Sequence, residues 1–177
     1  MEPDQAPSGA CNPVLTDYRV PAHLARRFHQ ICVGALAEAI EPAGITPGEY
    51  AVLVAIVDRA GLDQHRLAVA LGIDPVSAGQ RIDRLEAMGL IDRRVHPGDR
   101  RARVLNASRR GAALRRRLKP LALTAQERIM APLTAAEREL FLKFLTRIVE
   151  GNQSYARPGN GRRRPRRKGP EAENSPE

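Results

Sequence analysis

Apolar residues recur every three or four positions along most of the chain between about residues 20 and 150. This spacing is typical of helices that bury one face and expose the other. The clearest stripes are Leu24, Phe28, Ile31, Ala35 and Ala39; Tyr50, Leu53, Val54 and Val57; Ala78, Ile82 and Leu85; Leu114, Leu118, Leu121, Ala125 and Ile129; and Leu140, Phe141, Phe144, Leu145 and Ile148. Pro120 falls within the fourth stripe, where we expect a kink. The pattern predicts a mainly α-helical fold.

Two short helices are predicted between residues 63 and 89, separated by a glycine turn. Asp63 can cap the first of them by accepting free backbone N–H groups, and Gly72 can end it. Asp74 can cap the second, Pro75 suits its first position, and Gly89 supplies its stop. Two short helices joined by a tight glycine turn form a helix-turn-helix.

Capping boxes mark two further helix starts. Thr46 and Glu49, with Pro47 at the first helical position, open one helix, and Thr134 and Glu137 open the last one. The first helix and the last two carry surplus apolar surface and no catalytic pattern. Such helices leave an exposed patch that needs a partner, unless a monomer buries all of it internally.

An arginine-rich β-hairpin is predicted directly after the helix-turn-helix. Residues 90–95 indicate a strand, residues 96–99 a turn, and residues 102–106 the returning strand. The hairpin carries Arg93, Arg94, Arg100, Arg101 and Arg103. Five arginines so close together repel one another unless an anion lies nearby, and a phosphate backbone or narrow minor groove is the natural one. We interpret Asp99 as structural, orienting a wing arginine or capping the turn.

The second short helix presents a polar face opposite its apolar stripe. That face carries Ser77, Gln80, Arg81 and Arg84. These side chains can hydrogen-bond to base edges and phosphates in a major groove. In an isolated helix the same face would be explained by solvation alone. The hairpin that follows favours DNA reading, so we predict DNA contacts from these four residues and from the five hairpin arginines.

The same residues resemble the signature of MarR-type transcriptional regulators, small dimeric winged-helix proteins. The resemblance is carried by Gly89-Leu90-Ile91-x-Arg93, by Pro97-x-Asp99-Arg100-Arg101 and Gly111, and by Gly44-Ile45-Thr46-Pro47-x-Glu49-Tyr50-x-Val52-Leu53. It covers roughly residues 22–150, and the wing motif is its most specific part. Ala107 and Ser108 stand where the family usually has Leu-Thr, although Ser108 can still cap a helix.

The resemblance implies a winged helix-turn-helix domain over residues 17–150. Its DNA-binding lobe would span about residues 46–107, flanked by dimerisation helices at about 20–43 and 108–150. A homodimer would place two recognition helices in successive major grooves of double-stranded DNA. The operator would then be a near-palindrome with half-sites on the order of 10 bp apart. Repression by occluding RNA polymerase is the default expectation, and activation stays open.

The resemblance also implies a small-molecule ligand. Family members commonly bind small anionic phenolic or aromatic acids between the dimer helices and the winged-helix lobe. Residues 26–31 and 61–64 are similar to relatives that control aromatic-acid catabolism. His29 and Arg26 on the first helix are therefore our candidates for pairing with a carboxylate. For each of them, a solvated or core-satisfied side chain remains the alternative.

Composition bounds these expectations. The chain has 177 residues, of which 42% are apolar, enough for one core, and its net charge of +9 favours an anionic partner such as nucleic acid or a membrane surface. It carries no bilayer-spanning run or signal segment, so we expect a cytoplasmic protein without a membrane partner. Residues 1–16 and 151–177 are predicted to be disordered. Residues 151–177 hold seven Lys or Arg against three Glu. This positive tail would either attract DNA phosphates or serve only to keep the protein soluble.

Other function classes are weaker. The sequence lacks a phosphate-binding glycine loop, a metal-ligand cluster and a serine elbow, so we expect no catalytic residues, cofactor or metal. Oxidant sensing through a thiol is an alternative, but Cys32 lies mid-helix and Cys11 in the N-terminal tail. A protein that coats nucleic acid without sequence choice fits the charge but does not explain the helix-turn-helix and wing. A sequence-specific regulator still prefers its own site at moderate salt, whereas a coating protein loses its affinity for all nucleic acid.

Overall fold

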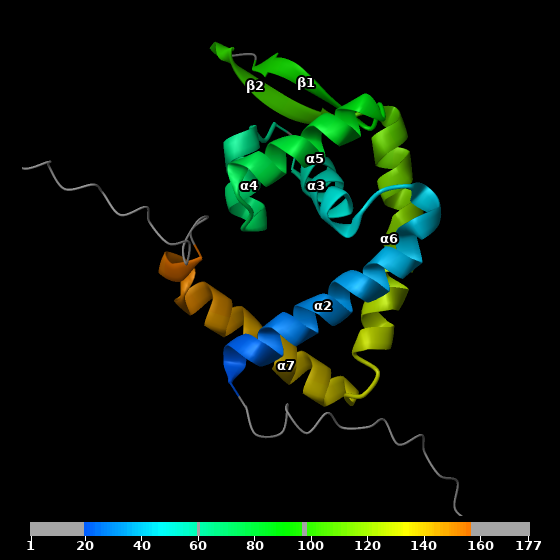
Figure 1. The fold of residues 1–177 in the computed structure, drawn as a ribbon, viewed down its shortest axis with the longest axis vertical. Helices are drawn as coiled ribbons and strands as arrows, with labels where there is room; N and C mark the ends of the chain where they lie inside the picture. The colour runs from blue at the N-terminus through cyan, green and yellow to red at the C-terminus, as the bar shows by residue number, and fades with distance from the viewer. Residues whose placement is uncertain (1–19, 60, 97–98, 157–177) are drawn as a thin grey trace, which may run out of the picture.

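The computed structural model describes residues 20–59, 61–96 and 99–156 (Figure 1). Its elements, in chain order, are α2 (Pro21–Ile40), η1 (Glu41–Ala43), α3 (Pro47–Asp58), α4 (Gln64–Leu71), α5 (Pro75–Ala87), β1 (Ile91–His96), β2 (Asp99–Ala107), α6 (Arg109–Ile129), α7 (Ala135–Gly151) and η2 (Gln153–Tyr155). The described strands form one two-stranded antiparallel sheet. The predicted mainly helical fold with a small β-wing is confirmed.

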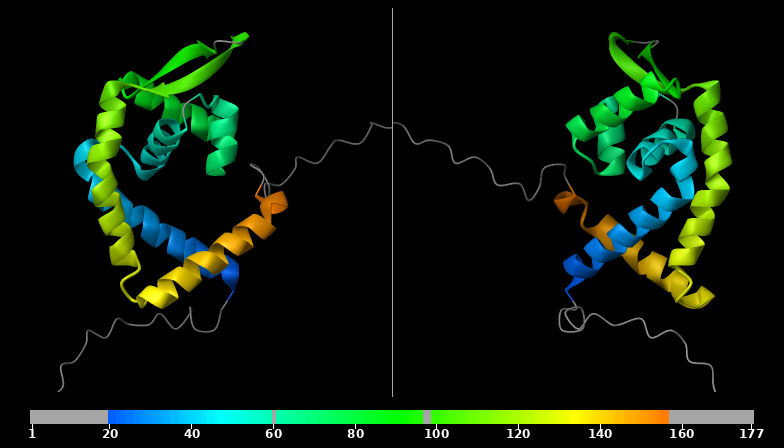
Figure 2. Two further views of the ribbon diagram at one scale, coloured as in Figure 1. Left: turned by 180° about the vertical axis from the view of Figure 1, so that it is seen from behind. Right: turned by 45° about the vertical axis from the view of Figure 1, so that its right-hand side comes forward.

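The elements separate into two groups. Helices α3, α4 and α5 lie together with the β1–β2 hairpin above them, and α6 runs down from this lobe alongside α2 and ends at the loop that leads into α7, which crosses α2 (Figures 1 and 2). The α2–α7 crossing is held by an edge-to-face contact of Phe28 with Phe141, whose ring centroids are 5.3 Å apart. Helix α6 continues through Pro120 from end to end. It therefore connects the lobe to the crossed helices.

Local signals fix the helix boundaries where they were predicted. Both capping boxes form, and the side chains of Asp63, Asp74 and Ser108 accept the backbone N–H groups of Arg66, Ser77 and Gly111. Gly72 and Gly89 adopt left-handed backbone conformations at φ 63° and 67°, which suits glycine at a helix end. The helix-turn-helix thus follows from side chains within a few residues of each helix end.

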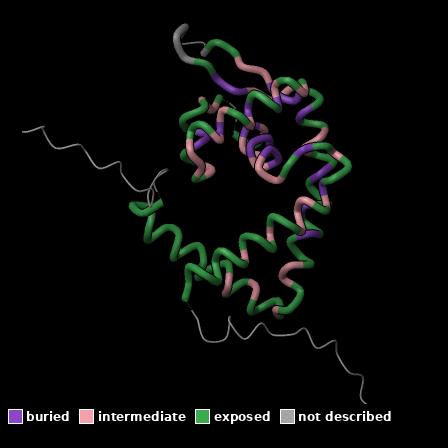
Figure 3. Tube along the Cα trace, in the orientation of Figure 1, coloured by how far each residue is buried: buried purple, intermediate pink, exposed green. Residues whose placement is uncertain are grey.

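The hydrophobic core lies in the lobe. Its most deeply buried side chains are Ile40, Val52, Leu53, Ile56, Leu67, Ile82, Leu85, Leu90 and Leu105. The predicted α5 stripe of Ala78, Ile82 and Leu85 is fully buried, as predicted. Burial is concentrated around α3, α5 and the upper part of α6, while the crossed helices below are mostly exposed (Figure 3).

The predicted stripe of the first helix is only partly correct, because Phe28, Ala35 and Ala39 are partly buried whereas Leu24 and Ile31 are not. Ile31 is 55% exposed, and Leu24 is exposed as well. A cavity against α6 and α7 is lined on this helix by Phe28, which belongs to the predicted stripe, and by Cys32 and Leu36, which do not. Apolar residues occur on more than one face of α2, and only one of these faces meets the rest of the chain.

Helix α7 contains no buried residue. Its exposed apolar side chains are Leu140, Leu142, Phe144, Leu145, Ile148 and Val149. Exposed apolar residues on α2 and α6 are Leu24, Ile31, Val33, Leu121 and Leu123. Many exposed apolar side chains on the helices of a single chain are typical of a protein that buries them in an interface.

The ends of the chain differ in what the structure describes. A short 3-10 turn, Gln153–Tyr155, lies within the segment that the sequence assigns to the C-terminal tail. Helix α7 also extends to Gly151, the first residue of that predicted tail. Residues 1–16 and 157–177 of the two predicted tails lie outside the described residues. Within the described ranges, no single helix is long and apolar enough to cross a membrane; by length and composition, only the pair Pro21–Ala43 and Pro47–Asp58, bent by 78°, passes that test together.

Candidate nucleic-acid interface

The start of α5 is fixed on the helix before it. Gln64, the first residue of α4, donates a hydrogen bond from its Nε2 to the carbonyl of Pro75, at 3.2 Å. Asp74 accepts from the Ser77 backbone N–H at 2.9 Å and from the Ser77 hydroxyl at 2.7 Å. These three hydrogen bonds hold the first turn of α5. Ser77, predicted to contact DNA, also serves in the cap.

The two arginines on the polar face of α5 lie against the N-terminus of α3. A Cβ on Gly48 would lie 2.8 Å from Cζ of Arg81, so the guanidinium occupies the space that glycine leaves open. Arg84 forms an ion pair with Glu49, with Nε and Oε1 2.8 Å apart. Gln80, directly before Arg81, is exposed. The polar face is therefore positioned by contacts with α3.

Glu49 has a role that the sequence did not indicate. It is only 5% exposed, and its Oε2 accepts the Thr46 backbone N–H at 2.7 Å. The sequence predicted this capping contact alone. Its other oxygen binds Arg84, 35 residues further along the chain. No short-range pattern connects two residues at such a separation.

The wing has the predicted strands: β1 has the predicted length of six residues and begins one position later, and β2 is longer than predicted. Arg93 pairs with Leu105 and Arg94 with Val104, and the register shifts between Val95 and His96. The returning strand begins at Asp99, inside the predicted turn. The Leu105 N–H donates to the carbonyl of Leu62 at 2.8 Å, which attaches the base of the wing to the segment before α4.

The side chains at the tip of the wing, including those of Asp99, Arg100 and Arg101, lie outside the described residues. Their predicted roles stay predictions. Two of the other three hairpin arginines already have partners. Arg94 forms an ion pair with Asp92 on its own strand, with Nε and Oδ2 2.6 Å apart. Arg103 is exposed and has no ion pair within the described part of the chain.

Arg93 lies between the wing and α5. Its guanidinium forms ion pairs with Asp83 and Glu86, and the side chain is 30% exposed. The hydrogen bond to Asp83 raises the pKa of Arg93, and the charge of Glu86 acts in the same direction. Its partners are carboxylates of this chain, so its geometry is that of an anchor that fixes the hairpin on the recognition helix.

A cleft separates α2 from α3 and α4. It has a volume of about 410 Å³ and is lined by Leu36, Tyr50, Ala51, Val54, Ala55, Asp58, Arg59, Ala70 and Leu71. Asp58 at its rim pairs with Arg115 of α6, at 3.2 Å. The Nε atom of Arg115 is buried without a hydrogen-bond partner among the described residues. Burial raises the pKa of Tyr50, so its phenol stays protonated.

The predicted ligand residues do not line this cleft. His29 and Arg26 are exposed on α2. His29 lies seven residues before Leu36, which places it on the same face of the helix two turns away. Arg115 was not predicted, because an arginine within the basic run of α6 carries no sequence signal that separates it from its neighbours.

Cys32 lines a second cavity, of about 330 Å³, between α2, α6 and α7. Burial raises the pKa of its thiol, which opposes formation of the reactive thiolate. Within residues 20–59, 61–96 and 99–156, no group of three or more His, Cys, Asp or Glu side chains could hold a metal ion.

The chain is similar to known regulators. The sequence model of the MarR family matches residues 43–102. The putative transcriptional regulatory protein for the hcr operon of Thauera aromatica is 34% identical over 119 residues, which cover 67% of this chain and 70% of that protein.

Two solved structures share the fold. PcaV of Streptomyces coelicolor, a transcriptional regulator in complex with its natural ligand, is 31% identical with a TM-score of 0.67; the match covers 75% of this chain and 93% of PcaV. BpsR of Bordetella bronchiseptica, whose DNA binding is regulated by 6-hydroxynicotinic acid, is 26% identical with a TM-score of 0.70; the match covers 75% and 94%.

Proposed function

The chain belongs to the MarR family of transcriptional regulators, and on this premise we propose that it is a homodimeric, sequence-specific repressor that a small aromatic acid releases from DNA. The observation that carries the proposal is the fixed geometry of α5. Its arginines rest on α3 through Gly48 and Glu49, and Arg93 ties the wing to its outer side. A recognition helix that is positioned before binding loses less entropy when it enters a groove.

The DNA contacts divide into two kinds. Gln80 and Arg81 read base edges, because they lie on the polar face of α5 and their side chains have the donors and acceptors for bidentate contacts. The phosphate contacts come from Ser77, Arg84, Arg94, Arg100, Arg101 and Arg103. Arg93 acts as a positioning residue between α5 and the wing.

The exposed apolar surface of α7, together with that of α2, supports the proposal of a dimer. Burying this surface against a second copy removes it from water at about 25 cal/mol per Å². A two-fold axis then presents two copies of α5 to successive major grooves, and a near-palindromic operator is the complement of that symmetry.

The aromatic acid binds in the cleft between α2 and α3. Its ring lies among the apolar lining, and its carboxylate pairs with Arg115, which does not line the cleft but lies beside it through its ion pair with the lining residue Asp58. The relative BpsR responds to an aromatic acid, which supports this ligand class. His29 and Arg26 lie closer to the N-terminus of α2 than the lining residue Leu36 does, and both stay candidates for contacts at the cleft entrance. Occupation of the cleft would change the angle between the lobe and the dimer helices.

Fluorescence anisotropy tests the proposal. The protein is titrated at moderate salt onto labelled DNA from upstream of its own gene and onto a scrambled duplex, with and without a panel of aromatic acids. We expect preference for the upstream DNA and its loss with one of the acids. Equal affinity for both duplexes, with a steep decline as salt rises, would instead favour a protein that coats nucleic acid without sequence choice.

A further inference from the structure

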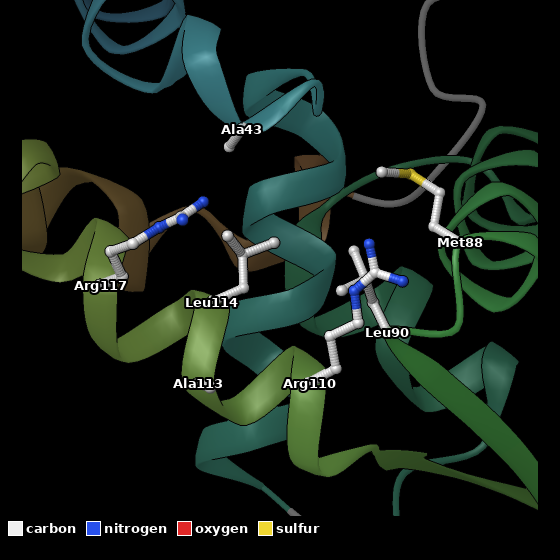
Figure 4. A pocket seen from close by; sticks show the side chains of 7 residues that line it. All are labelled: Ala43, Met88, Leu90, Arg110, Ala113, Leu114 and Arg117. Carbon is white, nitrogen blue, oxygen red and sulfur yellow. The ribbon is translucent and has the colours of Figure 1, made fainter.

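A cleft not described above lies on α6, beside the junction between the recognition helix and the wing. It has a volume of about 300 Å³, and its lining residues are Ala43, Met88, Leu90, Arg110, Ala113, Leu114 and Arg117 (Figure 4). Its lining shares no residue with the cleft between α2 and α3. A volume near 300 Å³ suffices for a small organic ligand.

Two arginines flank the apolar part of this cleft. Arg110 and Arg117 both come from α6, and Leu114 lies between them (Figure 4). Their Cα atoms are two helical turns apart, or about 10 Å at 1.5 Å per residue. Both side chains are exposed, and neither has a carboxylate partner within the part of the chain that the structure describes.

From this arrangement we propose that the cleft binds an acid with an apolar body and an acidic group at each end, such as an aliphatic dicarboxylate. The apolar body covers Leu114, Leu90 and Met88. The two carboxylates pair with Arg110 and Arg117, since a guanidinium binds a carboxylate with two parallel hydrogen bonds. A ligand with one acidic group satisfies only one of the two cations.

A ligand in this cleft would contact the residues that connect the recognition helix α5 to the wing and to α6. Met88 caps the C-terminus of α5, and Leu90 directly precedes β1. The Ser108 hydroxyl, at the start of α6, donates to the Gly89 carbonyl at 2.7 Å, and the Ser108 N–H donates to the Leu90 carbonyl at 3.0 Å. A molecule bound across Leu90 and Leu114 therefore touches both sides of the joint between α5 and α6.

Methionine methyl NMR tests this site directly, because the chain has three methionines and each reports on a different place. Met88 lines the proposed site, Met130 lines the cavity between α2, α6 and α7, and Met1 precedes the described residues. The methyl-labelled full chain is titrated with decanedioate at constant ionic strength. We expect a saturable shift of the Met88 methyl resonance while Met130 stays in place.

Variants separate the contributions of the two cations. Arg110→Gln and Arg117→Gln should each weaken decanedioate binding about tenfold, the equivalent of one charge-assisted hydrogen-bonding group. Arg116→Gln is the matched control, because Arg116 is exposed on the same helix and does not line the cleft. Decanoate should bind more weakly than decanedioate, and decanediol should not shift Met88.

Three results would overturn the proposal. A shift of Met130 without Met88 would place the acid in the other cavity, and equal binding by the Arg110 and Arg117 variants would remove the cations from the site. A loss of DNA affinity in either variant without any acid would mean that these arginines contact phosphates. None of these readouts depends on the aromatic acid, so failure here is distinguishable from failure of the proposed function.

Discussion

Glu49 and Arg84 form an ion pair across the interface of α3 and α5, with Oε1 and Nε 2.8 Å apart, while the other oxygen of Glu49 caps α3. One buried carboxylate thus serves both a helix end and the recognition helix. Replacing Glu49 with Ala should lower the free energy of unfolding by about 1–2 kcal/mol, because the cap is lost. Urea unfolding followed by circular dichroism measures this change.

The matched variant is Arg84→Ala. The Arg84 side chain is mostly exposed, so its loss should cost less than about 1 kcal/mol of stability. If both variants unfold at the urea concentration of the parent protein, the carboxylate does not serve the helix end. If Arg84→Ala proves the more destabilising of the two, the main cost is that of leaving the Glu49 carboxylate buried without its partner.

Gly48→Ala should weaken operator binding without lowering stability. The new Cβ would fall 2.8 Å from Cζ of Arg81, so the flexible guanidinium must move away from its place on α3. Alanine itself favours the helix. We expect the affinity for the operator to decline and the affinity for scrambled DNA to change little, as measured by anisotropy. Arg81→Ala should cost about 1–3 kcal/mol on the operator.

The outcome for Gly48→Ala also tests the assignment of the recognition face. Unchanged operator affinity in both Gly48→Ala and Arg81→Ala would show that Arg81 does not read bases. A large decline in stability for Gly48→Ala would mean that Arg81 cannot move aside, which would make the residue a packing element of the lobe.

Arg93 and Arg103 should differ in what their loss changes. Arg93→Ala breaks the contacts with Asp83 and Glu86 and should cost about 1 kcal/mol of stability. Arg103→Ala should leave stability unchanged, weaken operator and scrambled DNA alike, and reduce the salt dependence of binding by about one phosphate contact. Urea unfolding and anisotropy at several salt concentrations measure the two effects; the reverse assignment of effects would contradict the positioning role of Arg93.

The elements of the lobe could be predicted because their signals are local. Asp63, Asp74 and Ser108 each cap a helix through a contact three residues away, and Gly72 and Gly89 end helices through their own backbone conformation. Such contacts depend on only a few neighbouring residues, so they can be predicted from short stretches of sequence. The same holds for the hairpin, whose strands follow the predicted ranges to within a few residues.

The contacts that position the candidate interface could not be predicted in this way. Arg93 meets Asp83 only because the chain reverses between α5 and β1. Arg115 reaches Asp58 across 57 residues, so its place beside the cleft depends on the packing of α6 on α3. The inward face of α2 was predicted only in part, for a related reason. Its apolar residues at Ile31 and Cys32 are adjacent, and only tertiary contacts decide which one faces inward.

Cys32 should react slowly with alkylating reagents. Burial raises the pKa of its thiol, so at a given pH a smaller fraction is thiolate, and this fraction rises only at higher pH. In a Cys11→Ser background, the rate of alkylation by iodoacetamide should show its inflection at higher pH in the folded chain than in urea. Because folding favours the protonated thiol, its contribution to stability is lost as the pH rises through the folded pKa.

Fast alkylation of Cys32 at neutral pH in the folded chain would contradict this expectation. It would favour the alternative in which the protein senses oxidants through a thiol. Operator binding before and after mild peroxide treatment of the same Cys11→Ser variant would then decide whether the thiol controls DNA affinity.

Gly111→Ala should be among the most destabilising single substitutions in the lobe. A Cβ at this position would lie 2.0 Å from the carbonyl oxygen of Leu90 and 3.3 Å from Cδ1 of Leu53. The first of these atoms belongs to the backbone and accepts the Ser108 N–H, so it cannot move without breaking the joint between α6 and the wing. We expect a loss of at least about 2 kcal/mol in urea unfolding, as for overpacked cores. The control is Gly151→Ala at the end of α7, where nothing lies within 4 Å of the new Cβ; equal stability of the two variants would show that α6 can shift away from Leu90 at little cost.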